Sequence, residues 1–377
     1  MLSKTNGAAP ARAVPDVTGR GASELGELAG APRKAPNAPV SLADVRQAHA
    51  RIGEHLAPTP LVSHPLLNRR VGAEVFVKLE NTQSIGSFKI RGGINLLAQL
   101  SSDERRRGIV TATRGNHGQS LARAAGLYGA RCTIYVPRGN NPHKNAAMEA
   151  LGATVVVEGH DFDAAMAAAE AYADETGARL VHPAREPALI AGGGTVALEM
   201  LAQAGGGLDV LYVPVGGGSL ASGMAIAMQA LSPATRLVGV SAENAPAMHH
   251  AWHTGEDRAF VTTDTIADGL AVRLPVDMTL GVLRPLLDDW VLVSEAEIQQ
   301  AVRCYAETIH QLAEGAAAAG LAAALRHEGG THRKVGLVMT GGNIDTETLK
   351  RALAGEAPRH HPQAVPYYPI GELSYGY

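Results

Sequence analysis

The chain has 377 residues, of which 46% are hydrophobic, 18% charged and 4% aromatic, and its formal net charge is −3. This composition is that of a globular protein large enough for one large or two moderate domains. The near-neutral charge offers no footprint for nucleic acid or an anionic membrane, and no apolar run approaches the roughly 18 residues of a membrane span. Cys132 and Cys304 lie far apart without a CxxC motif, which fits a reducing cytoplasm better than a disulfide framework or a thiolate zinc site.

Residues 1–40 form a leader rich in Ala, Gly, Pro and Arg, with few apolar side chains to bury. We expect this leader to be disordered, because packing would not offset the entropy cost of ordering it. It also lacks the apolar stretch of a signal peptide. The folded region is expected to begin at Ser41, a good N-cap for an amphipathic helix that ends before Pro58 and Pro60.

After that helix, apolar runs of strand length alternate with Ala-rich runs of helix length. Strands are predicted at 74–80, 109–113, 132–137, 154–159, 179–183, 210–215, 237–243, 290–294 and 335–340. Helices are predicted near 92–100, 117–127, 143–151, 162–175, 194–204, 219–231, 295–311, 315–326 and 345–354. Buried strands with helices between them are typical of α/β proteins with open, mostly parallel sheets and helices on both faces.

The alternation predicts two domains. Residues 108–185 contain βαβαβαβ in short order and are expected to form a small domain, inserted into a large one made of 41–107 and 186–355. Ligands of such sheets bind at the carboxyl ends of the strands, so we expect a ligand cleft between the domains. The Pro- and Tyr-rich tail at 356–377 is not expected to be helical.

Lys89 is the first candidate for chemistry. It lies in SIGSFKIRGG, at the start of a predicted helix and among Ile85, Phe88 and Ile90. Burial among apolar side chains would lower the pKa of its amine, as Schiff-base chemistry needs. The alternative is a solvated lysine near a helix start, which is the common case.

Two strand-to-helix turns are candidate anion sites. In TRGNHGQS (113–120), free amides at the helix start could bind an anion and Asn116 offers a neutral amide, although Asn and Gly also simply form turns. In PVGGGSLASG (214–223), three glycines could bring amides onto a phosphate. Gly216, Gly218 and Ala221, with Glu243 further on, also fit a dinucleotide fingerprint, and this motif alone favours a dinucleotide.

The fourth motif is VMTGGNID (338–345), where a predicted strand ends in Thr340 and a Gly-Gly turn. Thr340 would present a neutral hydroxyl to the cleft. The alternative is an ordinary β-branched residue that closes a strand.

In this order, the four motifs resemble the fold-type II pyridoxal phosphate (PLP) enzymes of the tryptophan synthase β superfamily, most closely the threonine/serine dehydratases and serine racemase. The resemblance covers about 41–355 and includes HPAREPALIAGGGTVALE, TIADGLAV and AEGAAAAGLAAAL. It implies a two-lobed α/β fold, and it displaces the dinucleotide interpretation.

The resemblance also implies roles for single residues. Lys89 would form the Schiff base with PLP, with Phe88 beside the ring, and Asn116 would bond the ring hydroxyl. Gly269 would lie beside the ring, Glu314 matches the glutamate of the EGAGA stretch, and Thr340 takes the ring-nitrogen position. The phosphate would be held by Gly216, Gly217, Gly218 and Ser219, and the substrate carboxylate by the backbone of Thr113, Arg114, Gly115, Asn116 and His117.

The implied reaction is β-elimination of a β-hydroxy amino acid, L-threonine or L-serine by default, which gives ammonia and a 2-oxo acid through an aminoacrylate. A neutral Thr340 hydroxyl cannot protonate the ring nitrogen as a carboxylic acid would, which favours prompt loss of a β-leaving group. The alternatives are β-replacement, racemisation and, more distantly, a non-catalytic PLP-binding regulatory protein. By family habit, we expect a cytoplasmic homodimer.

Two positions depart from the family pattern. Position 114 is Arg, where the dehydratases commonly have a small residue and the racemase has a Ser; a guanidinium is a poor proton donor and acceptor, which argues against racemisation. Arg114 would pair with a second carboxylate or distal polar group of the substrate, or else face solvent or a glutamate. Glu243 keeps only one acidic ligand of the family's cation site, with His249 near the place of the other, so a divalent cation is not expected.

Overall fold

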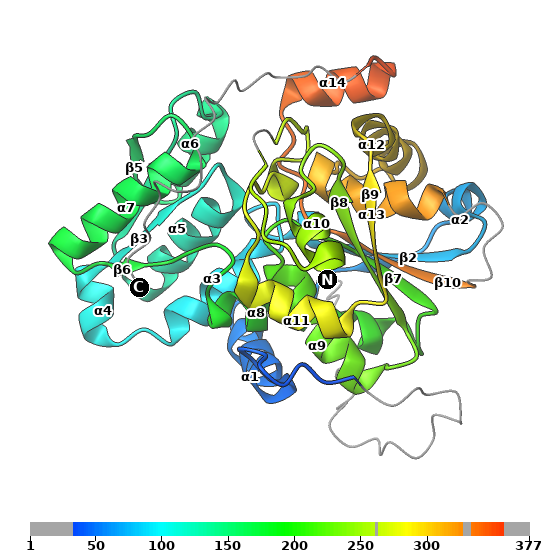
Figure 1. Cartoon of the computed structure of the whole chain (residues 1–377), viewed down its shortest axis with the longest axis horizontal. Helices are drawn as coiled ribbons and strands as arrows, with labels where there is room; N and C mark the ends of the chain where they lie inside the picture. The colour runs from blue at the N-terminus through cyan, green and yellow to red at the C-terminus, as the bar shows by residue number, and fades with distance from the viewer. Residues whose placement is uncertain (1–32, 261–262, 327–332, 358–377) are drawn as a thin grey trace, which may run out of the picture.

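The computed structural model describes residues 33–260, 263–326 and 333–357 (Figure 1). The strands in these ranges are β1 (Leu61–Val62), β2 (Glu74–Leu79), β3 (Ile109–Ala112), β4 (Cys132–Val136), β5 (Thr154–Val157), β6 (Arg179–Leu180), β7 (Val210–Pro214), β8 (Arg236–Ala242), β9 (Asp289–Val293) and β10 (Lys334–Met339). The nine predicted strands therefore exist, and the two-residue β1 was not predicted.

The helices include all ten that the sequence predicts. Their bounds are α1 (Leu42–Gly53), α2 (Pro65–Val71), α3 (Lys89–Ala98), α4 (Ser102–Arg107), α5 (Asn116–Tyr128), α6 (Pro142–Ala150), α7 (Phe162–Thr176), α8 (Pro187–Gln203), α9 (Ser219–Leu231), α10 (Ala247–Thr254), α11 (Asp277–Leu286), α12 (Glu295–Ile309), α13 (Gly315–Leu325) and α14 (Thr346–Ala354). The sequence analysis missed α2, α4, α10 and α11.

The larger sheet has the strand order β1-β2-β10-β7-β8-β9, and every neighbouring pair is parallel except β1 with β2. Its register places the functional turns side by side. Met339 pairs with Leu79, so β2 and β10 end level, and β7 follows next to β10. The turn before Lys89, the turn at Thr340 and the glycine turn after β7 therefore leave the same edge of the sheet.

Helices cover both faces of this sheet, as expected for a parallel sheet. One face packs Val77, Leu337 and Val240 against α2, α12 and the Ala-rich α13. The other face packs Val213 and Val338 against α8, α9 and α11. The α/β fold class with helices on both faces is confirmed.

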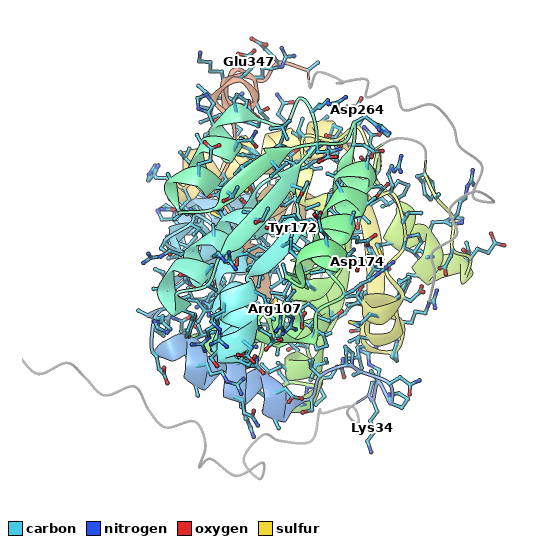
Figure 2. All side chains as sticks on the ribbon, turned by 90° about the vertical axis from the view of Figure 1, so that its left-hand side faces the viewer. Lys34, Arg107, Tyr172, Asp174, Asp264 and Glu347 are labelled. Carbon is cyan, nitrogen blue, oxygen red and sulfur yellow. The ribbon has the colours of Figure 1, made fainter. Side chains whose placement is uncertain are left out.

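The smaller sheet has the order β5-β4-β3-β6, with all neighbours parallel, and lies apart from the larger sheet in Figure 1. Val110 and Ala112 pack against α7, whereas Ile109 and Ile134 pack toward α5 and α3. Figure 2 looks onto its α7 side. All four strands lie within 109–180, but the limits 41–107 with 186–355 and 108–185 for the two domains stay a prediction.

Helix α8 begins at Pro187, whereas the sequence predicted a start near 194. The prediction started too late because Gly192, Gly193 and Gly194, which are unfavourable in helices, lie inside α8. Glycine normally weakens a helix interior, but here it permits close packing. A Cβ at Gly192 would lie 2.6 Å from Cα of Gly92 in α3, and one at Gly194 would lie 2.8 Å from the carbonyl oxygen of Gly223 in α9. Close helix contact therefore overrides local propensity at this point.

Helix α1 begins after Ser41, as predicted, and Ser41 forms a capping box with Asp44. Ordered contacts start earlier than Ser41, since Arg33 pairs with Asp288 at 2.9 Å and Val40 is buried. The rest of the predicted leader, residues 1–32, lies outside the described residues, as does the tail from 358. Within the described ranges, no helix combines the length and the apolar character that crossing a bilayer requires.

Candidate active site

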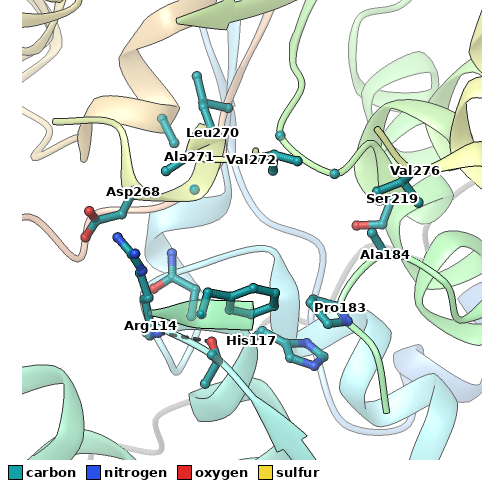
Figure 3. A pocket seen from close by; sticks show the side chains of 18 of the residues that line it. Arg114, His117, Pro183, Ala184, Ser219, Asp268, Leu270, Ala271, Val272 and Val276 are labelled. Carbon is teal, nitrogen blue, oxygen red and sulfur yellow. Dashed lines mark hydrogen bonds between the residues drawn. The ribbon is translucent and has the colours of Figure 1, made fainter. Parts of the chain in front are cut away.

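A cavity of about 330 Å³ opens between the two sheets, at the carboxyl ends of their strands (Figure 3). Every residue to which the resemblance assigns a cofactor or substrate role lines it. These are Phe88, Lys89, Thr113, Arg114, Gly115, Asn116, His117, Gly216, Gly217, Gly218, Ser219, Gly269, Glu314 and Thr340. The sequence motifs, up to 251 positions apart along the chain (89 to 340), thus meet in one place.

Lys89 is the first residue of α3, and its side chain enters the cavity. Its Nζ lies 3.5 Å from the hydroxyl of Ser219 and 5.2 Å from the centre of the Phe88 ring. Burial lowers the pKa of Lys89 to about 8, although the nearby Glu314 carboxylate acts in the opposite direction. The amine is therefore much closer to its nucleophilic, neutral form at physiological pH than an exposed lysine is.

The glycine turn between β7 and α9 provides an anion site next to this lysine. Gly218 caps α9 in the left-handed conformation, at φ 87°, which glycine adopts without cost. No side chain caps α9, so its first amides are available to an anion. A Cβ at Gly216 would lie 2.1 Å from the carbonyl oxygen of Gly269, so these two backbones can approach only because residue 216 is glycine.

The loop before α5 supplies fewer free amides than the sequence analysis assumed. The amide of Thr113 donates to the carbonyl of Tyr135, and the amide of Gly115 donates to the Thr113 hydroxyl at 3.1 Å. Helix α5 begins at Asn116 without a side-chain cap. Two of the five backbone amides in the predicted cradle, those of Thr113 and Gly115, therefore already have partners within the protein, and the cradle itself stays a prediction.

The His117 ring is buried and has a partner within the smaller sheet. It lies 3.1 Å from the Thr111 hydroxyl. Burial lowers the pKa of His117 to about 3, so the ring stays neutral. His182, which also lines the cavity, has its pKa lowered to about 4 by burial, with help from Arg185, and accepts a hydrogen bond from the Ala184 amide.

Asn116 and Glu314 form a pair on the cavity wall. The Asn116 Nδ2 donates to Oε1 of Glu314 at 2.8 Å. Burial raises the pKa of Glu314, which Lys144 and the bond from Asn116 only partly offset. Thr340 directly follows β10, which ends one residue earlier than predicted, and its Oγ1 is buried without a hydrogen-bond partner among the described residues.

The side chain of Arg114 points toward Asp268 within the cavity (Figure 3), and its role toward a substrate stays a prediction. Asp268 lies in the 3-10 helix η2 (Asp268–Leu270) and forms an ion pair with Lys144 of α6. Although burial acts in the opposite direction, Asp268 raises the pKa of Lys144. Lys144 and Arg114 thus both lie near Asp268, and the Glu314 carboxylate also acts on Lys144.

A second ionic contact joins the two sides of the cavity. Arg273, in the loop after η2, pairs with Asp163 in the first turn of α7 and lies 3.5 Å from Asp161, the N-cap of that helix. Sequence reasoning missed these residues, together with Lys144 and Asp268. Of these residues, only Asp268 could have been noticed in the sequence, because it lies next to Gly269 in TIADGLAV.

Glu243, the weak candidate metal ligand, lies outside the cavity. It pairs with Arg326 at 3.7 Å, and about half of its side chain is exposed. Among the described residues, no three His, Cys, Asp or Glu side chains gather in a way that could hold a metal ion.

Comparison with known proteins identifies the class to which this cavity belongs. Residues 52–341 match the family described as pyridoxal-phosphate dependent enzyme. The chain belongs to this family, and its cofactor is PLP.

Relatives and solved structures agree with this assignment. The chain is 38% identical to an L-threonine ammonia-lyase of Thermotoga maritima, over 83% of this chain and 78% of the relative. It is 34% identical to the catabolic L-threonine dehydratase of Escherichia coli, over 83% of this chain and 96% of that relative.

Two structures with the same fold extend the comparison. Serine racemase from Dictyostelium discoideum matches with a TM-score of 0.76 and 33% identity, over 82% of this chain and all of that one. Threonine deaminase isoform 2 from Solanum lycopersicum matches with a TM-score of 0.79 and 29% identity, over 83% of this chain and 92% of that one. The fold-type II assignment is therefore confirmed.

The residues present fit PLP. The unpaired Oγ1 of Thr340 calls for a polar ligand atom, as a pyridine nitrogen would provide. The uncapped start of α9 suits a phosphate, and a lysine of lowered pKa lies beside it. These three features lie in one cavity, at the positions that the motifs predicted.

Proposed function

We propose that this protein is an ammonia-lyase that removes water from a β-hydroxy amino acid, with L-threonine or L-serine as the default substrate. The observation that carries the proposal is the meeting of Lys89, the glycine turn, Asn116 and Thr340 in one cavity. The L-threonine ammonia-lyase of Thermotoga maritima, at 38% identity, supports the choice of substrate class.

The Lys89 amine has the central role in this proposal. When bound, PLP withdraws electron density from the substrate Cα and makes its proton acidic. Lys89 would hold the cofactor in the resting protein. Once the substrate amine has displaced it, the freed Lys89 amine would take that proton, since a pKa of about 8 leaves a usable fraction of neutral amine near neutral pH. The Ser219 hydroxyl, 3.5 Å from Nζ, helps to direct the amine.

Other residues hold the ligand groups. The start of α9 binds the phosphate, Thr340 meets the ring nitrogen, and Asn116 donates to the ring hydroxyl. The start of α5 binds the substrate carboxylate, assisted by the positive charge of Lys144. These assignments are those that the motifs imply, and each residue named lines the cavity.

The products follow from the balance of atoms. Loss of the Cα proton and of the β-hydroxyl removes one water and leaves an enamine. Hydrolysis of the released enamine takes up one water and gives ammonia and a 2-oxo acid. The chemistry at Thr340 supports this outcome, because a neutral hydroxyl does not protonate the ring nitrogen and a long-lived carbanion is disfavoured.

The test is a screen of the PLP-loaded protein with L-serine, L-threonine and a β-hydroxy dicarboxylic amino acid. Ammonia and 2-oxo acid should appear in equal amounts, and Lys89→Ala should abolish both. Unchanged turnover in Lys89→Ala would refute the proposal, as would formation of a D-amino acid without ammonia. The same substrates with Arg114→Ala test a second-carboxylate contact: only the dicarboxylic substrate should lose most of its binding.

We also propose that the protein acts in the cytoplasm as a homodimer. The two described cysteines are both free and buried, which suits a reducing compartment. Light scattering of the purified protein tests the assembly, and a mass near 39.1 kDa would contradict it.

A further inference from the structure

The residue of interest is Asn343, which lies four residues after β10 and outside the cavity lining. Its Nδ2 donates two hydrogen bonds. One goes to the carbonyl oxygen of Ile85 at 2.9 Å, and the other goes to Oδ1 of Asn116 at 2.7 Å. Asn343 therefore connects the turn before Lys89 to the asparagine that lines the cavity.

The direction of these bonds is fixed by chemistry at the Ile85 end. A backbone carbonyl only accepts hydrogen bonds, so the Asn343 atom that faces it must be the NH₂ group. That same NH₂ group faces Asn116, which must then present Oδ1 to it. The Nδ2 of Asn116 is left on the other side, where it contacts Glu314 at 2.8 Å on the cavity wall.

The hydrogen bond between Asn116 and Glu314 does not by itself determine which way the Asn116 amide is turned. Burial raises the pKa of this carboxyl group, and a protonated carboxyl group can donate as well as accept. A free Asn116 amide could therefore turn over and present its oxygen to the cavity. Asn343 is the contact that excludes this orientation.

The surrounding backbone is shaped to admit Asn343. Gly86 has φ 68°, and a Cβ at this position would lie 2.6 Å from Oδ1 of Asn343. The Gly342 amide donates to the Gly86 carbonyl at 2.9 Å, and Ser87 bridges to Gly341. The two turns that carry Lys89 and Thr340 are thus joined where Asn343 is held.

We propose that Asn343 is a positioning residue that orients the Asn116 amide so that its NH₂ group, and not its oxygen, faces the cofactor. This inference rests on the proposed function, in which Asn116 donates to the ring hydroxyl. An ionised ring hydroxyl accepts hydrogen bonds and is repelled by an amide oxygen. Asn343 thereby determines whether Asn116 stabilises or destabilises the bound cofactor.

The test uses Asn343→Asp and Asn343→Ala in the full chain. The Asp side chain has the same shape but offers only acceptors, so it draws Nδ2 of Asn116 toward itself and turns the oxygen to the cavity. The dissociation constant for PLP should rise about tenfold in Asn343→Asp, the scale of one hydrogen bond to a charged group, and by less in Asn343→Ala. The visible absorbance of the bound cofactor should fall relative to its near-ultraviolet band in Asn343→Asp, because an ionised ring oxygen without a donor takes up a proton.

The matched control is Asn81→Asp. Asn81 Nδ2 also donates to a side-chain oxygen, Oε1 of Gln311 at 2.9 Å, and to the Leu312 carbonyl at 3.3 Å, but it lies outside the cavity lining. This control should keep the spectrum and PLP affinity of the wild type. Equal loss of affinity in all three variants would assign Asn343 a structural role only and overturn the inference.

Two further readouts complete the test. Circular dichroism shows whether Asn343→Asp folds. If it does not, the absorbance spectrum and PLP affinity of Asn343→Ala test the inference instead. A wild-type spectrum with unchanged PLP affinity in Asn343→Ala overturns the inference. The proposed function fails separately, when the wild-type protein takes up no PLP on Lys89 or forms no 2-oxo acid. A wild-type enzyme that passes both checks, with an unaltered spectrum in both Asn343 variants, rejects the inference alone.

Discussion

Lys89 shows how a single residue obtains its chemistry from its surroundings. At the first position of α3 it lies beside Phe88 and within 3.5 Å of Ser219, and its burial disfavours the ammonium form. The neutral amine is the form that could act as nucleophile toward a cofactor aldehyde. The fold therefore makes this lysine reactive before any ligand binds.

The first prediction concerns the pH dependence of cofactor uptake. A lowered pKa means that the neutral amine, absent at low pH, appears as the pH rises through about 8 instead of through the ordinary lysine range. The rate of PLP uptake by cofactor-free protein should therefore rise with pH and level off above about 8. Stopped-flow absorbance measures it, and a rate that keeps rising past pH 10 would contradict the burial of Lys89.

Thr340 supports a second prediction at the same scale. Its hydroxyl is buried without a partner among the described residues, which costs folding free energy, whereas valine has the same shape and no hydroxyl. Thr340→Val should leave the melting temperature of cofactor-free protein unchanged or higher, while its affinity for PLP falls a few-fold. A lower melting temperature together with normal PLP affinity would show that Thr340 acts in folding and not in binding.

At the scale of elements, α3 is held in place by a buried ionic cluster. Arg91, two residues after Lys89, pairs with Glu80 at 2.7 Å and with Glu199 of α8 at 2.6 Å, and Lys78 of β2 pairs with Glu199 at 2.6 Å. The Thr59 hydroxyl donates to Glu80 at 2.6 Å. Two cations and two carboxylates thus balance in the interior and connect α3 to both β2 and α8.

The third prediction removes one member of this cluster. Arg91→Leu leaves two carboxylates buried with one lysine, so the free energy of unfolding should fall by about 3–5 kcal/mol. Urea titration followed by circular dichroism measures the change. Arg46→Leu, at an exposed arginine of α1, is the matched control and should alter stability by less than about 0.5 kcal/mol. Similar losses in the two variants would mean that the cluster does not hold α3.

The sequence predicted the elements well where burial dominates and poorly where it does not. All nine apolar runs became strands. Strands β3, β7 and β10 are almost entirely buried and read as continuous apolar segments, whereas β5 and β6 are only partly buried. Helices α2 and α4 were missed since they are short, and α4 (SDERRR) has no buried residue. The Ser101 and Glu104 capping box was a readable signal for α4 that the analysis did not use.

The site was predictable only as far as local motifs reach. Lys89, Asn116, the glycine turn and Thr340 each lie in a recognisable turn, and all of them line the cavity. Lys144 and Arg273 lie outside the four motifs, and Asn343 lies inside VMTGGNID without any sign of its partner. Their partners are Asp268, Asp163 and Asn116, each more than 100 positions away, and no local pattern marks such pairs.

At the scale of the whole molecule, two ionic contacts join the sides of the cavity. Lys144 of α6 pairs with Asp268, and Arg273 pairs with Asp163 at the start of α7, so the loop after η2 is tied to helices of the smaller sheet. These groups are partly exposed, and each pair contributes only about 0.2–1 kcal/mol. Such weak contacts add little to the free energy of unfolding.

The fourth prediction tests this contact. Arg273→Ala should raise KM about two- to fivefold while kcat and the melting temperature stay near those of the wild type, because only a weak contact across the cavity is lost. Steady-state kinetics at low and high salt measure it. Arg303→Ala removes the pair with Glu307 within α12 and should leave KM unchanged. An equal KM in both variants would show that Arg273 does not act at the cavity.

The central claim is that Lys89 carries PLP, and borohydride reduction tests it most directly. The PLP-loaded protein is reduced and digested, and its peptides are weighed by mass spectrometry. We predict the cofactor mass on the peptide that contains Lys89, and no fixed label in Lys89→Ala. A label on Lys144, the other lysine of the cavity, or no label on any peptide would contradict the account.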